Sequence, residues 1–178
     1  LNGKSIDAHL AFVLGYTLRS LYDLESSGDV EKSAAMAQSY IDKLVKLQQD
    51  LPLAYERLGF TYYVLARQHL NQATDPTEAL QKGLEALGTC DKLRRGQDGL
   101  CSSLTAKLLS LQAQQLRQQG KAVSKLLERS LAMAQQGHDA PREDGLHRPF
   151  AQQDLGTGLH DPLVGFLVDV GRQVVQFQ

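Results

Sequence analysis

Three histidines near the end of the chain, His138, His147 and His160, are the residues whose type could hold a metal ion. Zinc is bound by histidine and cysteine side chains at short, characteristic spacings. Here the histidines are nine and thirteen residues apart, and no cysteine lies near them. We therefore expect them to be exposed in loops, and we expect no metal or other cofactor.

The chain has two cysteines, Cys90 and Cys101, and both fall on the apolar faces of predicted helices, on either side of a turn. In an oxidising compartment they could form a disulfide, provided that their Cα atoms approach within about 7 Å. Two buried free thiols are the plainer alternative. Redox catalysis is not expected, because there is no Cys-x-x-Cys pair and no adjacent base.

The overall charge favours neither a nucleic acid nor a membrane as partner. The 178 residues include 19 Lys and Arg and 20 Asp and Glu, and the cations are scattered along the chain. A nucleic-acid-binding domain usually presents a basic face. No apolar run reaches the roughly 18 residues of a membrane span, so we expect no membrane insertion of this region. Because the first residue is Leu1, we expect a processed chain or an excised fragment.

Helices are predicted throughout most of the chain. Aromatic residues make up 6% and tryptophan is absent, a composition that favours helices over strands. The clearest pattern spans 53–94, where a turn separates two apolar stripes of helical spacing. The second stripe opens at Asp75-Pro76, an N-cap acid followed by a proline suited to a first turn. Similar patterns predict helices over 5–27, 30–49 (capped by Asp29), 53–70, 76–94, 100–119 and 121–136.

Short motifs recur at intervals of about 44 to 46 residues. Leu14-Gly15-Tyr16 matches Leu58-Gly59-Phe60, Asp29 matches Asp75, and Leu70-Asn71-Gln72 matches Leu116-Arg117-Gln118. A fixed interval of this length with two helices in each copy is typical of a helical solenoid. Three such copies would fill residues 1–137.

The composition changes after residue 137. We expect a linker or loop over 138–160 and a terminal helix over 161–178, which begins at Asp161-Pro162 and caps the stack. A strand is the alternative for 161–178, because Val and Phe are frequent there and Gly165 and Gly171 weaken a helix.

The Leu-Gly-Tyr and Leu-Gly-Phe motifs, the small residues Ala66 and Ala79, and the Asp75-Pro76 turn resemble tetratricopeptide (TPR) repeats. The resemblance is to an elongated kind that is fused to bacterial serine/threonine protein kinases, and it is best over 54–93. It implies an all-α fold of antiparallel helix hairpins stacked in a right-handed superhelix, in which Gly59 lets two helices approach closely. Because the interval exceeds the usual TPR length, HEAT-like and other helix-hairpin arrays stay open as alternatives. A cytoplasmic and a periplasmic location in a bacterium both stay open.

Kinase chemistry itself is not expected in this chain. His147-Arg148-Pro149 and Asp154-Leu155-Gly156 superficially echo two kinase motifs. A kinase site also needs a catalytic Asp after His-Arg, a downstream Asn, a glycine-rich loop and a strand lysine. None of these is present, so we interpret both echoes as chance and expect no enzyme.

The resemblance also implies a concave groove lined by the first helix of each repeat, which would bind a protein or peptide. Carried over to this sequence, it assigns the following groove residues: Tyr16, Arg19, Glu56, Phe60, Tyr63, Leu109 and Gln112. In the alternative interpretation, Tyr16 and Phe60 only pack between adjacent repeats. The expected function is a non-catalytic binding module, a scaffolding or sensory part of a bacterial signalling protein. The second hypothesis is an assembly domain that oligomerises through its apolar segment over 163–177.

Overall fold

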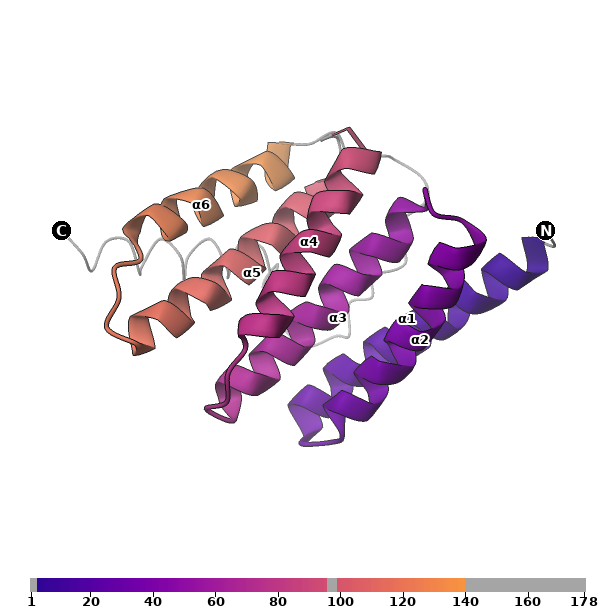
Figure 1. The fold of residues 1–178 in the computed structure, drawn as a ribbon, viewed down its shortest axis with the longest axis horizontal. Coiled ribbons are helices and arrows are strands. Elements are labelled where there is room, and N and C mark those ends of the chain that lie inside the picture. Colours follow the sequence, from indigo (N-terminus) through magenta and orange to yellow (C-terminus); the bar gives the residue numbers. More distant parts are fainter. Residues whose placement is uncertain (1–2, 96–98, 140–178) are drawn as a thin grey trace, which may run out of the picture.

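A computed structural model describes residues 3–95 and 99–139, and these form six helices (Figure 1). They are α1 (Gly3–Ser26), α2 (Val30–Leu47), α3 (Pro52–Asn71), α4 (Thr77–Leu93), α5 (Gly99–Gln118) and α6 (Ser124–Asp139). The described part of the chain contains no strand, so the prediction of an all-α protein is confirmed. Helix α6 extends to Asp139, slightly beyond the predicted start of a linker at 138. The rest of that linker, His147, His160 and the terminal segment over 161–178 lie outside the described residues.

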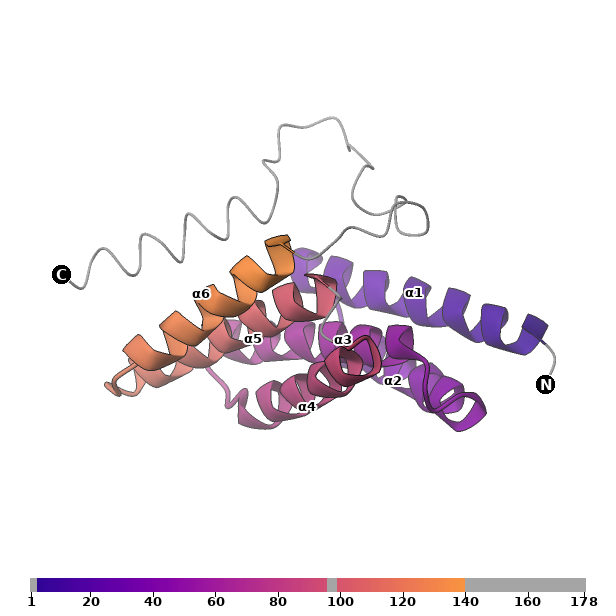
Figure 2. The same ribbon diagram turned by 90° about the horizontal axis from the view of Figure 1, so that it is seen from above.

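Consecutive helices pack as three hairpins, which lie side by side in chain order from violet to orange in Figure 1. Contacts between hairpins follow one scheme. Each second helix contacts the next first helix (α2 with α3, α4 with α5), and the first helices contact each other in series (α1 with α3, α3 with α5). Figure 2 shows α3 between α1 and α5. The described pairs α2–α4 and α4–α6 do not pack together in this way, so the first helices form the continuous layer.

The first helix of every hairpin ends in the same turn. Ser27, Ala73 and Gly120 have a positive φ, of 58°, 54° and 70°. The next residue donates its N–H to a carbonyl five residues back: Gly28 to Asp23 (2.7 Å), Thr74 to His69 (2.8 Å) and Lys121 to Leu116 (2.9 Å). This is the left-handed helix terminus that normally selects glycine. Ser27 and Ala73 adopt it with a side chain, at a cost in backbone strain.

The acid after each of the first two turns interacts with the helix that follows. Asp29 is the N-cap of α2 and accepts a hydrogen bond from the N–H of Lys32 at 3.0 Å, as predicted. Asp75 accepts from the N–H of Thr77 at 3.0 Å, but α4 begins at Thr77 and Pro76 is its N-cap. The predicted start of this helix was therefore one residue early.

Glycines distinguish the hairpins. A Cβ placed on Gly59 would lie 2.5 Å from Cγ and Cδ2 of Leu87, so this glycine permits the close approach of α3 and α4 that the resemblance implied. Gly15, its partner in the sequence match, would have nothing within 4 Å of its Cβ. Val13 instead packs in the core with Ile41 of α2. The match between Leu14-Gly15-Tyr16 and Leu58-Gly59-Phe60 is therefore wrong as a structural alignment.

The second and third hairpins are covalently joined. Cys90 near the end of α4 is bonded to Cys101 near the start of α5, with Cα atoms 6.4 Å apart, and both residues are fully buried. Around them lies the larger hydrophobic core cluster, which includes Leu80 and Leu87 from α4 and Leu104 and Leu108 from α5. The sequence left two alternatives for these cysteines, a disulfide and two buried free thiols, and the structure contains the disulfide.

Candidate functional site

The seven residues assigned to a groove do not form one surface. Tyr16 is half-buried, and its ring stacks on Tyr40 of α2 with 5.8 Å between ring centroids. Phe12 stacks on the same Tyr40 ring at 4.8 Å. Tyr16 therefore packs within the first hairpin, against its own α2, and not between adjacent repeats as the packing alternative expected.

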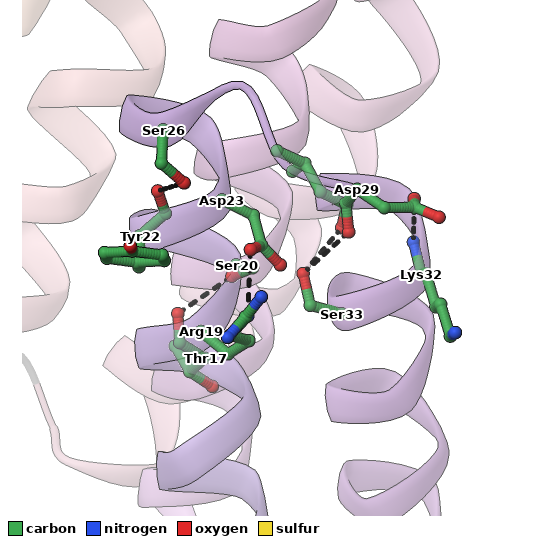
Figure 3. A network of polar contacts seen from close by, with 10 residues as sticks. Thr17, Arg19, Ser20, Tyr22, Asp23, Ser26, Asp29, Lys32 and Ser33 are labelled. Carbon is green, nitrogen blue, oxygen red and sulfur yellow. Dashed lines mark hydrogen bonds and ion pairs between the residues drawn. The ribbon is translucent and has the colours of Figure 1, made fainter.

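Arg19 is held along its own helix (Figure 3). Its Nε lies 2.8 Å from Oδ1 of the buried Asp23, one turn further on, and its guanidinium lies 5.4 Å from the ring centroid of Tyr22. Beside this pair the hydroxyls of Thr17 and Ser20 donate to backbone carbonyls of α1. Arg19 thus has its charge balanced inside the first hairpin.

Glu56 and Leu109 are not at the surface, and the expectation that they project from it is wrong. Leu109 is 0% exposed, because α5 packs against α3, α4 and α6. Glu56 is 1% exposed, with Oε1 3.4 Å from Nη2 of Arg57 and Oε2 4.0 Å from Nη2 of Arg94. A buried carboxylate needs such neighbours to offset the loss of hydration. Glu56 therefore balances charge within the protein.

Gln112 lines a pocket of about 420 Å³ between α4 and α5. The neighbouring Gln115 donates from Nε2 to Oδ1 of Asp75 (3.0 Å) and to Oγ1 of Thr77 (2.8 Å). Thr77 donates to Asp75 from its hydroxyl and from its backbone N–H, and these two hydrogen bonds lower the pKa of the Asp75 carboxyl. The polar groups here are bonded to one another and hold the start of α4 against α5.

Phe60 and Tyr63 remain, and they lie together on α3. Both are half-buried against the larger core cluster, with ring centroids 6.0 Å apart. Two cations adjoin the Tyr63 ring. Cζ of Arg67, one turn along α3, lies 5.8 Å from its centroid, and Nζ of Lys107 on α5 lies 5.9 Å from it. We call these four residues, Phe60, Tyr63, Arg67 and Lys107, the α3–α5 cluster.

The charged residues of the α3–α5 cluster are both cations. Within residues 3–95 and 99–139, neither Arg67 nor Lys107 lies within ion-pair distance of a carboxylate. Burial, and secondarily the nearby charge of Arg67, lower the pKa of Lys107. Both effects disfavour the charged ammonium. The cation–π contact with the tyrosine ring acts in the opposite direction and contributes about 0.5 to 2 kcal/mol.

Sequence reasoning found the two rings of this cluster and missed its two cations. Arg67 could have been found, because it follows Tyr63 by one helical turn on the same face. Lys107 could not, because the alignment of α5 with α3 depends on the exact length of each turn.

No family model matches the chain, and no curated protein or solved structure matches it either. No group of three or more His, Cys, Asp or Glu in the described residues is placed to hold a metal ion. None of the described helices has both the length and the apolar character needed to cross a bilayer.

Proposed function

We propose that this chain is a non-catalytic module that binds a protein or peptide on the layer formed by its first helices, at the α3–α5 cluster. The supporting observation is that two half-buried rings and two cations, which have no ion-pair partner among the described residues, lie together across two adjacent helices. Aromatic rings offer large contact area at a low cost in side-chain entropy, and arginine is enriched at interfaces for its directional hydrogen bonds.

We further propose that the hairpins stack as a right-handed, TPR-like superhelix. Three features support it: the continuous layer of first helices, the contact of each second helix with the next first helix, and the recurring left-handed turn. Such a stack holds the binding residues on rigid helices, so little conformational entropy is lost on binding. The role as a scaffolding or sensory part of a bacterial signalling protein rests only on the resemblance of residues 54–93 to TPR repeats.

The test is a peptide selection against the folded chain, followed by affinity measurements on two double variants. Phe60→Ala with Tyr63→Ala should weaken the selected peptide at least tenfold. Phe12→Ala with Tyr22→Ala removes two more exposed rings from α1, 51% and 60% exposed, and should leave the affinity unchanged. Circular dichroism confirms that both variants are folded at the assay temperature, since Phe60 and Tyr63 also contribute to the core. Equal affinities of the two variants would refute the assignment.

A further inference from the structure

We infer that the α3–α5 cluster takes a carboxylate-bearing ligand, namely an acidic peptide segment whose side-chain carboxylates lie between Arg67 and Lys107. This rests on the proposed function, since it specifies the chemistry of the ligand at the same surface. The observations behind it are the positions, the burial and the missing counter-charge of the two cations.

The two cations converge on one ring from two different helices. Arg67 reaches the Tyr63 ring from the next turn of α3, and Lys107 reaches it from α5. Because α3 and α5 pack against each other within a hydrophobic core, neither cation can move away with its helix. The site is therefore preorganised for a group of negative charge.

The one acidic residue of α3, Glu56, is not available to neutralise them. Glu56 lies about three helical turns before Arg67 and is already beside Arg57 and Arg94. Within the protein as described, other cations do obtain carboxylates: Arg19 pairs with Asp23 at 2.8 Å and Lys82 with Glu78 at 2.6 Å. Arg67 and Lys107 differ from these in being half-buried and in having no carboxylate partner within residues 3–95 and 99–139.

A carboxylate fits this site better than a neutral group. It would accept charge-assisted hydrogen bonds from both cations, with arginine able to bind it through two parallel N–H groups. It would also remove the repulsion between the two partly desolvated cations. The rings of Phe60 and Tyr63 offer apolar contact to the residues that flank the carboxylate, which favours a peptide over a free anion.

The experiment compares two labelled, terminally blocked peptides of equal length, one alternating Glu with Leu and the other alternating Gln with Leu. Binding is followed by fluorescence anisotropy at low ionic strength, where charge-assisted bonds are least screened. We expect the Glu peptide to bind at least tenfold more tightly, in keeping with the gain from hydrogen bonds to charged groups. Inorganic phosphate is titrated as a competitor, with chloride at the same ionic strength as the control. We expect phosphate to displace the Glu peptide no more effectively than chloride does.

Two variants test whether Lys107 contributes to the preference for the Glu peptide. Lys107→Met leaves Arg67 as the one cation of the cluster, so it should reduce the preference for the Glu peptide. It should not lower the melting temperature, because it removes a partly buried charge and retains the apolar stem. Lys125→Met, at an exposed position of α6, should keep the preference. A purely structural lysine would instead lower the melting temperature when replaced and leave the preference intact.

The outcomes separate the two proposals. If neither peptide binds, the proposed function fails at this surface and the inference fails with it. If both bind with equal affinity, or if the preference is undiminished in Lys107→Met, the surface binds peptides but the acidic ligand is refuted. Displacement by phosphate well below the matched chloride concentration would refute the peptide as occupant in favour of a free anion.

Discussion

Replacing each of two glycines by alanine separates the packing seen in the structure from the pattern seen in the sequence. Gly15 and Gly59 occupy matching Leu-Gly-aromatic motifs, yet only Gly59 faces another helix. An alanine Cβ at Gly59 would lie 2.5 Å from two carbons of Leu87, which is fully buried. At Gly15 the same atom would meet nothing within 4 Å.

The expected magnitudes follow from two terms. In a helix interior, alanine is more favourable than glycine by about 1 kcal/mol, and this gain applies at both positions. Overpacking of a filled core costs about 1 to 3 kcal/mol and applies only at Gly59. Gly15→Ala should therefore stabilise the protein by about 1 kcal/mol, and Gly59→Ala should destabilise it by about 1 kcal/mol.

The assay is urea unfolding followed by far-UV circular dichroism, with thermal melting as a second readout. The difference between the two variants, roughly 2 kcal/mol, cancels the propensity term and corresponds to about 4 to 8 °C in melting temperature for a chain of this size. Equal effects of the two substitutions would refute the packing of α3 on α4 and restore the alignment suggested by the motifs.

Three further predictions concern turns, the disulfide and pH. Ala73→Gly should raise the free energy of unfolding by about 1 kcal/mol and Gly120→Ala should lower it by a similar amount, since both residues have a positive φ. Urea unfolding of the two variants should therefore give changes of opposite sign. Two changes of the same sign would contradict the shared turn. Reduction of the Cys90–Cys101 disulfide, which joins residues 11 apart, should lower the free energy of unfolding by about 3 kcal/mol through loop-closure entropy. A reductant should lower the melting temperature of the wild type and leave that of a Cys90→Ala, Cys101→Ala variant constant. An unchanged melting temperature of the wild type would contradict the bond. Because the pKa of Lys107 is lowered on folding, its charged form destabilises the folded state at neutral pH. This destabilisation is relieved as pH rises through the folded pKa toward the ordinary value of 10.5. Unfolding at several pH values should therefore show the wild type gaining stability relative to Lys107→Met toward alkaline pH, and a constant difference would refute the shift.

The helices were predictable because their signals are local. Apolar stripes at helical spacing and the cap at Asp29 depend on residues a few positions apart, and the observed helices follow them closely. The role of Gly59 came from the resemblance to TPR repeats, which implied that two helices approach closely there. The structure adds that Leu87 of α4 is the residue in contact.

The candidate site was less predictable, because it depends on how the hairpins align. The recurring turns at Ser27, Ala73 and Gly120 define the structural alignment. The Leu-Gly-aromatic match differs from that alignment by two residues. Two residues are more than half a helical turn, so residues carried over from Phe60 and Tyr63 land on a different face. Tyr16 therefore contacts Tyr40 of its own hairpin. Conversely, Lys107 approaches Tyr63 only because α5 packs on α3, a long-range contact that no local pattern encodes.

The most direct test of the proposed binding surface is a titration of isotope-labelled protein with the Glu-Leu peptide, followed by backbone amide NMR. We predict that the largest shift changes fall on α3 between Phe60 and Arg67 and on α5 around Lys107. Changes concentrated around Phe12 and Tyr22 of α1, or around Gln112 in the α4–α5 pocket, would contradict it.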